Sequence, residues 1–323
     1  MTEKVVFGPV PSRRLGRSLG VNNIPHKYCT YSCVYCQVGR TLHFEIGIEE
    51  YYTPAEIIRT VISHVKKFES KINYITFVPD GEPTLDMNLG KEITGIKNET
   101  STMVAVITNG SLIYKDDIKD GLYNADTVSI KVDAITPEIW KCINRPHPKL
   151  KLDKILDGIV NFSKRYNERL ITESMLCKGV NDKEDEIENI AKFLSGINVD
   201  TAYIAIPTRP PAESWVEPAD EQTILMAHEI FSKYLGKMHV ELLTGYEGPS
   251  FENISEDPIH GFLAITAVHP MRIEYAHKFF FERGLQPEEV INKLLEENKI
   301  TKLSYRGYEF ILHKFKSEKQ GKN

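Results

Sequence analysis

Three cysteines lie close together near the start of the chain, at Cys29, Cys33 and Cys36. Iron-sulfur clusters are held by cysteine thiolates, normally by four of them. The other two cysteines, Cys142 and Cys177, stand more than a hundred residues downstream. The spacing therefore predicts a [4Fe-4S] cluster with three protein ligands. Its fourth iron would be open to a non-protein ligand, and we expect chemistry at that position.

Two other interpretations of the cysteines are open from the residues alone. A zinc site needs a fourth ligand at a suitable spacing, and His26 or His43 could supply it. Structural disulfides are typical of small secreted chains. This chain has five cysteines in 323 residues, and the clustering of three of them favours thiols that bind metal in a reducing compartment.

The cysteine spacing, with Tyr35 just before the last cysteine, resembles the signature of the radical S-adenosylmethionine (SAM) superfamily. The resemblance implies that SAM chelates the open iron through its amino and carboxylate groups. One electron then cleaves SAM to a 5'-deoxyadenosyl radical, which abstracts hydrogen from a substrate. The cofactors carry that chemistry, and the protein orients them and selects the substrate. A flavodoxin- or ferredoxin-type electron donor is implied as a partner.

Two further motifs resemble superfamily motifs. Asp80-Gly81-Glu82-Pro83-Thr84 is similar to the GGEP motif, with Asp80 in place of the first glycine. The resemblance implies that this turn binds the SAM amino group. Thr108-Asn109-Gly110 also recurs in the superfamily, and its side chains could bind ribose or substrate. The alternative for this second motif is an ordinary Asn-Gly turn.

Polar side chains also alternate along two predicted strands. Ser129, Lys131 and Asp133 share one face of their strand because side chains alternate with a period of two. Three such residues cannot all lie in an apolar core. The resemblance assigns this face to the SAM ribose and carboxylate, and the alternative is an ion pair between Lys131 and Asp133. Glu173 and Met175 share a face of the next strand, and Glu173 is predicted to join the cofactor site.

Two charged segments are candidates for substrate recognition. The loop at 207–218 contains four prolines and carries Arg209, Glu213 and Trp215. A rigid loop with an anion binder and an aromatic side chain suits substrate recognition at a barrel mouth, and packing over the rim is the alternative. Three arginines within residues 13–17 could bind an anion such as a substrate phosphate, or clamp the lead segment to the barrel.

The elements that must position these residues follow a regular pattern. From about residue 50, short β-branched or aromatic runs alternate with helical patterns, which predicts βα units and a parallel sheet. Six strands are expected, at 18–22, 74–78, 103–107, 127–132, 170–176 and 201–206. Four helices are expected, at 54–70, 152–166, 183–197 and 219–235. The fold class is α/β, and six strands match the partial (β/α)6 barrel that the resemblance implies, whose site lies at the strand carboxyl ends.

A different pattern begins after the core domain, which we place at 1–250 with a lead segment at 1–25. Three helical stretches and a hairpin predict a small winged-helix-like module at 251–315, followed by a polar tail at 316–323. The third helical stretch, 286–299, holds four glutamates and two lysines, which disfavours phosphate binding. Docking on the barrel or on a protein partner is the expected role, although wing residues could still contact RNA.

Composition places further bounds on function. The net charge of −5 gives no global footprint for nucleic acid. The chain has no apolar run of about 18 residues that could span a membrane, and its first residues lack a signal-peptide pattern. We therefore expect a cytoplasmic protein with no membrane partner. An oxygen-sensitive cluster also suggests an anaerobic organism.

The residues and the resemblance together identify the chain as a radical SAM enzyme whose substrate is not fixed by the motifs. Over residues 5–250 it resembles prokaryotic radical SAM Fe-S oxidoreductases grouped with the wyosine-base (tRNA guanosine) synthases, which makes an RNA nucleoside a candidate substrate. Modification of a peptide or protein is an alternative. A second alternative, from another class, is a non-catalytic Fe-S redox sensor that acts through its winged-helix module.

Overall fold

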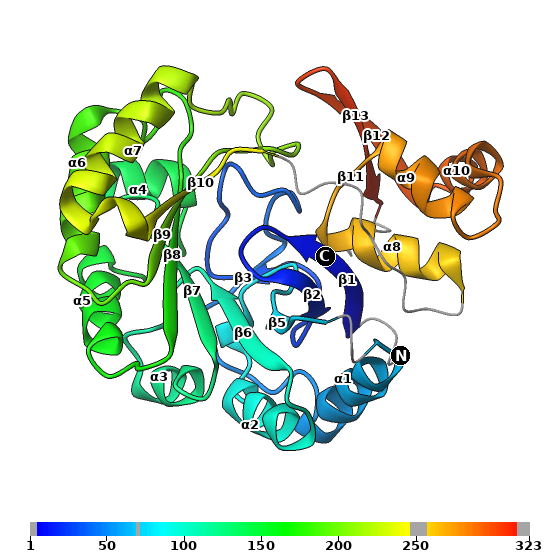
Figure 1. The fold of residues 1–323 in the computed structure, drawn as a ribbon, viewed down its shortest axis with the longest axis horizontal. Coiled ribbons are helices and arrows are strands. Elements are labelled where there is room, and N and C mark those ends of the chain that lie inside the picture. Colours follow the sequence, from blue (N-terminus) through cyan, green and yellow to red (C-terminus); the bar gives the residue numbers. More distant parts are fainter. Residues whose placement is uncertain (1–4, 69–71, 246–256, 315–323) are drawn as a thin grey trace, which may run out of the picture.

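A curled sheet of eight strands forms the centre of the molecule. The computed structural model describes residues 5–68, 72–245 and 257–314. The strand order is β1-β2-β5-β6-β7-β8-β9-β10. All neighbours from β2 to β10 pair in parallel, and β1 pairs antiparallel with β2 at one edge. The sheet curves into a half-barrel with helices on its convex side (Figure 1).

All six predicted strands are present. They are accompanied by β1 and β10, which the sequence-based prediction lacks. β1 contains two prolines and a glycine, which argue against a strand, and β10 has only four residues. The strands are β1 (Val6–Ser12), β2 (Gly16–Val21), β5 (Tyr74–Phe77), β6 (Met103–Thr108), β7 (Thr127–Lys131), β8 (Arg169–Met175), β9 (Thr201–Ala205) and β10 (Val240–Leu243).

The helices on the convex side include the four that were predicted, now α1, α5, α6 and α7. α1 begins as expected, because Thr53 Oγ1 accepts a hydrogen bond from Glu56 N at 3.3 Å and Pro54 occupies the first helical position. The helices of the barrel are α1 (Pro54–Phe68), α2 (Leu89–Glu99), α3 (Asp116–Leu122), α4 (Pro137–Asn144), α5 (Leu152–Ser163), α6 (Glu184–Ser195) and α7 (Glu221–Leu235).

Glycines explain why α2 and α3 are missing from the sequence-based prediction. A Cβ on Gly95 would lie 2.2 Å from Ile58 Cδ1, and a Cβ on Gly90 would lie 2.7 Å from Gly121 Cα. The glycines therefore allow α2 to approach α1 and α3 closely. The same residues lower helix propensity. The local sequence therefore gives only a weak signal for helices that tertiary packing stabilises.

Short elements complete the barrel part of the chain. The cysteine loop, residues 26–45, is framed by β3 (Tyr28–Cys29) and β4 (His43–Phe44), which pair in parallel. Two single-turn 3-10 helices, η3 (Pro83–Leu85) and η4 (Lys237–His239), follow β5 and α7.

The C-terminal module contains the three helices and the hairpin that the sequence predicts. Its elements are α8 (Pro258–Val268), β11 (Met271–Arg272), α9 (Ile273–Phe281), α10 (Pro287–Glu296), β12 (Ile300–Tyr305) and β13 (Tyr308–His313). The hairpin turns at Arg306 and Gly307, which both have positive φ. Its sheet has the order β11-β13-β12. The winged-helix interpretation of the module stays a prediction, and the predicted polar tail lies outside the described residues.

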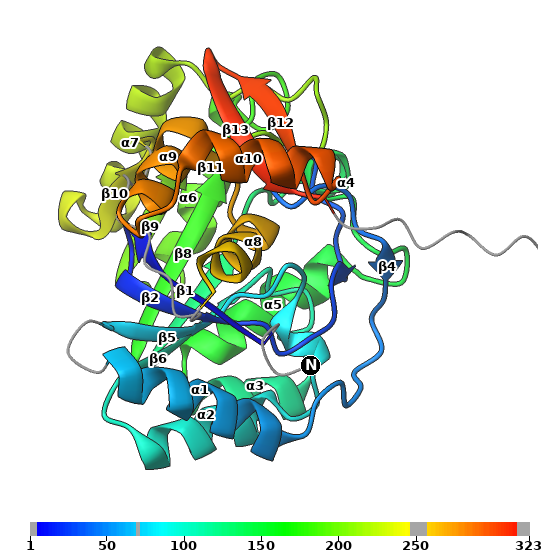
Figure 2. The same ribbon diagram turned by 90° about the vertical axis from the view of Figure 1, so that its right-hand side faces the viewer.

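The module packs against the edge of the barrel. Phe7 and Val10 of β1 belong to the same apolar cluster as Phe262 of α8 and Phe280 of α9. Two views place α8 directly beside β1 (Figures 1 and 2). The first strand of the sheet and the C-terminal module therefore share one core.

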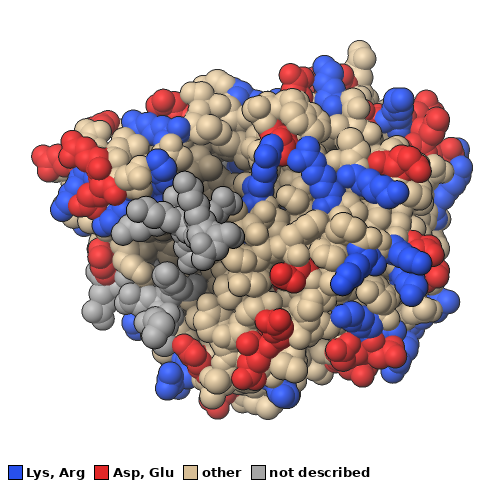
Figure 3. All heavy atoms as spheres, turned by 180° about the vertical axis from the view of Figure 1, so that it is seen from behind, with Lys and Arg blue, Asp and Glu red and all other residues tan. Residues whose placement is uncertain are grey.

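The surface charge and the lengths of the helices are relevant to whether the chain binds nucleic acid or a membrane. On the face seen from behind, acidic and basic side chains are both widely distributed (Figure 3). Within the described ranges, every helix is too short or too polar to cross a membrane.

Candidate active site

A cavity of about 310 Å³ lies inside the half-barrel and extends from the β1–β2 turn to the carboxyl ends of the strands. Its wall is built by the β1–β2 turn, the cysteine loop, the segments that follow β5, β6 and β9, and the end of α8. Cys29, Cys33 and Cys36 all line it. The predicted cluster ligands thus lie where barrel proteins place their sites.

Backbone hydrogen bonds fix the shape of the cysteine loop. Cys36 N donates to Cys33 O at 3.1 Å, and Gly39 N donates to Cys36 O at 3.1 Å. Val34 N donates to Ile143 O at 2.9 Å, which ties the loop to α4. The three thiols are therefore presented by an ordered backbone.

The chemistry of the thiols fits a metal cluster. All three cysteines are half-buried and unbridged. Burial raises the pKa of Cys29 well above its ordinary value and that of Cys33 to about 12. The thiols therefore stay neutral unless a nearby cation stabilises the thiolates. A cluster of iron ions supplies that positive charge, because metals bind cysteine as the thiolate.

The zinc interpretation requires four ligands around one point. Among the described residues, no three His, Cys, Asp or Glu side chains converge closely enough to hold a metal ion. The thiolates of a cluster bind different irons and need not converge on one point. The two candidate histidines have other contacts: His26 Nδ1 contacts the carboxylate of Asp80, and the ring of His43 stacks on the ring of Tyr28 with 4.1 Å between ring centres.

The Glu82 carboxylate connects the ends of β5 and β6. It accepts hydrogen bonds from Thr84 N at 3.1 Å, Thr84 Oγ1 at 2.6 Å, Thr108 Oγ1 at 2.5 Å and Asn109 N at 2.8 Å. Burial raises its pKa, and these four bonds act in the opposite direction. Glu82, Thr108 and Asn109 all line the cavity. The carboxylate predicted to bind SAM thus has protein partners and holds the neighbouring motif in place.

Gly81 is required by the cysteine loop. A Cβ at this position would lie 1.9 Å from Tyr28 O, and the next residue, Glu82, donates from its N to the same oxygen at 3.0 Å. The space left by the missing side chain is therefore occupied by the backbone beside Cys29. Gly81 also lines the cavity, whereas Pro83 is buried at the start of η3 and outside the lining.

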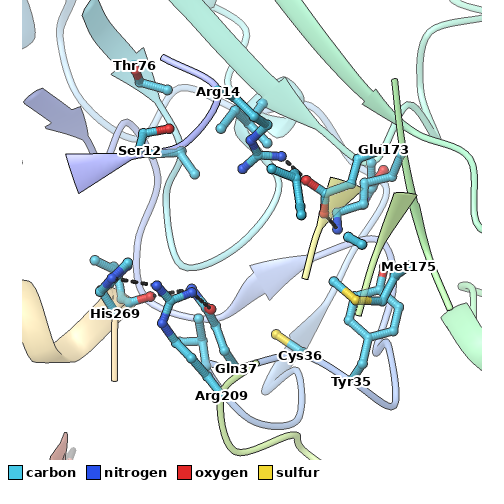
Figure 4. A pocket seen from close by; sticks show the side chains of 18 of the residues that line it. Ser12, Arg14, Tyr35, Cys36, Gln37, Thr76, Glu173, Met175, Arg209 and His269 are labelled. Carbon is cyan, nitrogen blue, oxygen red and sulfur yellow. Dashed lines mark hydrogen bonds and ion pairs between the residues drawn. The ribbon is translucent and has the colours of Figure 1, made fainter. Parts of the chain in front are cut away.

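Lys131 and Glu173 form one side of the cavity. They are register partners on the neighbouring strands β7 and β8, and they form an ion pair. Arg14 forms a second ion pair with Glu173 (Figure 4). The Lys131 ammonium also lies 5.0 Å from the ring centre of Tyr35. Burial lowers the pKa of Lys131.

The alternative that we considered, an ion pair between Lys131 and Asp133, is replaced by this cross-strand pair. Asp133 instead accepts hydrogen bonds from Tyr35 Oη, from Asn144 Nδ2 at 2.7 Å and from Met175 N at 2.9 Å. Asp133 and Ser129 are buried outside the cavity lining. Of the predicted polar face, only Lys131 reaches the cavity.

Of the three substrate candidates on the 207–218 loop, Arg209 is the one that lines the cavity. Its Nη1 donates to Gln37 Oε1 at 2.9 Å, and its Nη2 lies 2.7 Å from His269 Nε2. Gln37 Nε2 donates to Val268 O at 2.9 Å. This cluster lies across the cavity from Arg14 and Glu173 (Figure 4), and it joins the cysteine loop, the 207–218 loop and the C-terminal module.

The other two substrate candidates lie elsewhere. Glu213 binds Arg40 through two hydrogen bonds of 2.8 and 2.9 Å, and Arg145 Nη1 donates to it at 2.6 Å. These bonds, led by the one from Arg40, lower the pKa of Glu213. Trp215 is half exposed and outside the cavity lining. The contacts of Glu213 join the 207–218 loop to the cysteine loop and to Arg145, as the packing-loop alternative requires, whereas the role of Trp215 stays a prediction.

Sequence reasoning missed several residues of the site. Gln37 lines the cavity, and its position directly after Cys36 was an available signal. Asn144 contacts Cys33 from the end of α4, and His269 reaches the cavity from the C-terminal module. Neither residue belongs to a recognisable motif, and both are distant from the cysteines in sequence, so only the fold brings them to the site.

A half-barrel of mainly parallel strands covered by helices, with three thiols at its carboxyl edge, places the chain in the class of α/β partial-barrel proteins. Residues 23–194 match the family described as the radical SAM superfamily. The chain belongs to this superfamily. It is therefore an enzyme of a family that implies an iron-sulfur cluster and SAM.

Individual proteins resemble the chain to different extents. The UPF0026 protein MJ1312 of Methanocaldococcus jannaschii is 43% identical over 317 residues, covering 97% of each chain. A probable dual-specificity RNA methyltransferase RlmN of Thermotoga petrophila is 24% identical and covers 61% of this chain and 57% of its own. A structure of TYW1 with a lysine-pyruvate adduct bound has a TM-score of 0.51 at 15% identity, covering 67% of this chain and 73% of that one. This structural likeness supports the partial-barrel fold.

Proposed function

We propose that the chain binds a [4Fe-4S] cluster through Cys29, Cys33 and Cys36 and cleaves SAM reductively over the barrel mouth. The observation that carries the proposal is that all three thiols line one cavity together with the predicted strand-end motifs. When bound, the cluster and SAM supply a 5'-deoxyadenosyl radical that takes hydrogen from the substrate. A flavodoxin- or ferredoxin-type protein is the proposed electron donor.

The protein's own residues have three tasks in this proposal. The cysteine loop leaves one iron to SAM. Lys131, paired with Glu173, orients a polar group of SAM or substrate inside the cavity. The apolar part of the wall, including Val78 and Ile206, excludes water from the radical.

An RNA nucleoside is the proposed substrate. The resemblance to wyosine-base synthases and the relative named an RNA methyltransferase support this class. The cavity also contains arginines, with Arg209 near the carboxyl ends of the strands and Arg13 and Arg14 on the β1–β2 turn near their amino ends. Guanidinium groups suit the phosphates that flank a nucleoside.

Anaerobic reconstitution followed by a cleavage assay tests the proposal. The chain and the Cys33→Ala variant are reduced with dithionite in the presence of SAM, and 5'-deoxyadenosine is measured by mass spectrometry. We expect product from the unvaried chain and at least a hundredfold less from the variant, because loss of one thiolate removes the site-differentiated cluster. Each sample is assayed with and without bulk tRNA from the source cell.

The outcomes separate the candidate functions. Stimulation of 5'-deoxyadenosine formation by tRNA supports a nucleoside substrate, whereas stimulation by a tRNA-free protein extract supports the peptide-modifying alternative. A full cluster that fails to bind SAM would contradict the proposal and favour the redox sensor.

A further inference from the structure

Two side-chain amides contact sulfur atoms of the cysteine loop. Asn109 Nδ2 lies 3.7 Å from Cys29 Sγ, and Asn144 Nδ2 lies 3.4 Å from Cys33 Sγ. The two asparagines come from different parts of the barrel, the segment after β6 and the last turn of α4. Both amide nitrogens are within hydrogen-bond distance of sulfur.

Neighbouring groups fix which end of each amide faces the sulfur. Asn144 Nδ2 donates to Asp133 Oδ2 at 2.7 Å, and an ionised carboxylate can only accept. Asn109 Oδ1 accepts from Ser111 N at 2.9 Å, and a backbone N–H can only donate. The carbonyl oxygen of Asn109 therefore faces Ser111 N, and its NH₂ group faces Cys29.

The amide hydrogens are sufficient for both sets of contacts. An amide NH₂ carries two hydrogens. One hydrogen of Asn109 bonds Thr30 Oγ1 at 2.8 Å, and one hydrogen of Asn144 bonds Asp133. The second hydrogen of each remains for a cysteine sulfur. Asn144 is buried with 3% of its surface exposed, so few solvent molecules compete for that hydrogen.

We propose that Asn109 and Asn144 are positioning residues that raise the reduction potential of the cluster, an inference that rests on the proposed function of the three cysteines. Reduction adds one electron, from the protein donor or dithionite, and the added negative charge spreads onto the sulfurs. Donors to those sulfurs stabilise the reduced form more than the oxidised form. No proton is transferred in this step.

Leucine variants test the proposal. Asn109→Leu and Asn144→Leu keep a similar side-chain size but remove the donor, and they leave little room for a replacement water. Asn181→Leu is the matched control, because Asn181 is buried and donates to Asp133 O and Met175 O at 2.8 Å without contacting a cysteine ligand of the cluster. Reconstituted samples are compared by iron and sulfide content and by EPR-monitored potentiometric titration without SAM.

We expect both variants to shift to more negative potentials, the double variant to shift furthest, and the control to match the unvaried chain. Equal potentials in all loaded samples would overturn the inference. Failure of the unvaried chain to take up iron and sulfide would instead overturn the proposed function. The two failures are thus distinguishable.

A second measurement covers the case in which a variant does not fold. The unvaried chain is labelled with ¹⁵N only in asparagine side-chain amides, and its reduced cluster is studied by pulsed EPR. We expect ¹⁵N couplings from amides that bond ligating sulfurs. A loaded and reduced cluster without such couplings would contradict the inference independently of any variant.

Discussion

Glu92 is a carboxyl group enclosed by the protein on α2. It has no exposed surface and lies beside Asp86, which itself accepts hydrogen bonds from Asn88 N at 2.9 Å and Asn23 Nδ2 at 3.2 Å. Burial, followed by the charge of Asp86, raises the pKa of Glu92 far above its ordinary value of 4.5. Glu92 is therefore protonated at neutral pH in the folded chain.

The free energy of unfolding should depend on pH through this residue. Above pH 4.5 the folded state keeps a proton that the unfolded chain has lost, so stability falls as pH rises toward the raised pKa, by at most about 1.4 kcal/mol per pH unit. Glu92→Gln removes this loss, because glutamine is neutral at every pH. We expect a flatter dependence between pH 5 and 9 in urea titrations. The same slope in Glu92→Gln and the unvaried chain would contradict this, and exposed Glu99→Gln is the control.

At the scale of single residues, the sequence predicted which side chains line the cavity better than it predicted their contacts with one another. The three cysteines, Lys131 and Glu173 all line the cavity. Alternation assigned Asp133 to the same face as Lys131, but it does not reveal register between strands. The pairing of Lys131 with Glu173 depends on that register, and so it could not be predicted from the local pattern.

At the scale of elements, the turn after β5 supports the cysteine loop. Gly81→Ala would place a Cβ 1.9 Å from Tyr28 O, and the backbone beside Cys29 must then move. We expect the variant to lose most of its iron after reconstitution while far-UV circular dichroism stays close to that of the unvaried chain.

Gly47→Ala provides the matched control for this prediction. Its Cβ would have no neighbour closer than Glu49 Oε1 at 3.8 Å, although it lies close to the cysteine loop in sequence. Iron content should therefore be unchanged. If Gly81→Ala also loaded normally, the loop would not depend on the close approach at Gly81.

Prediction of the elements succeeded where the local signal was strong. Five of the six inner strands, all except β2, are β-branched or aromatic runs, and burial on both faces makes such runs recognisable. The elements α2, α3 and β1 were missed because glycine and proline weaken the signal in segments that are stabilised by contacts with distant parts of the chain. The local sequence contains no information about those contacts.

At the scale of the whole molecule, the shared core predicts that barrel and module unfold together. Phe262 is fully buried between the module and β1, and Phe262→Ala should cost about 3–5 kcal/mol. The chain has two tryptophans, Trp140 and Trp215, and both belong to the barrel part. Their fluorescence thus reports on a region distant in sequence from the substitution.

We expect Phe262→Ala to lower the denaturant midpoint measured by tryptophan fluorescence as much as the midpoint measured by circular dichroism. Leu303→Ala is the control, because Leu303 is an exposed side chain of the same module. A fluorescence midpoint that stayed unchanged in Phe262→Ala would mean that the two parts unfold independently.

The contribution of Val268 and His269 to the cavity wall has a consequence for synthesis on the ribosome. The cysteine loop leaves the ribosome more than two hundred residues before α8 does. Until α8 has emerged and packed against β1, the cavity lacks the wall that these residues provide. The nascent chain therefore passes through a period in which its thiols are more accessible than in the finished protein, and this period offers an opportunity for delivery of iron and sulfide.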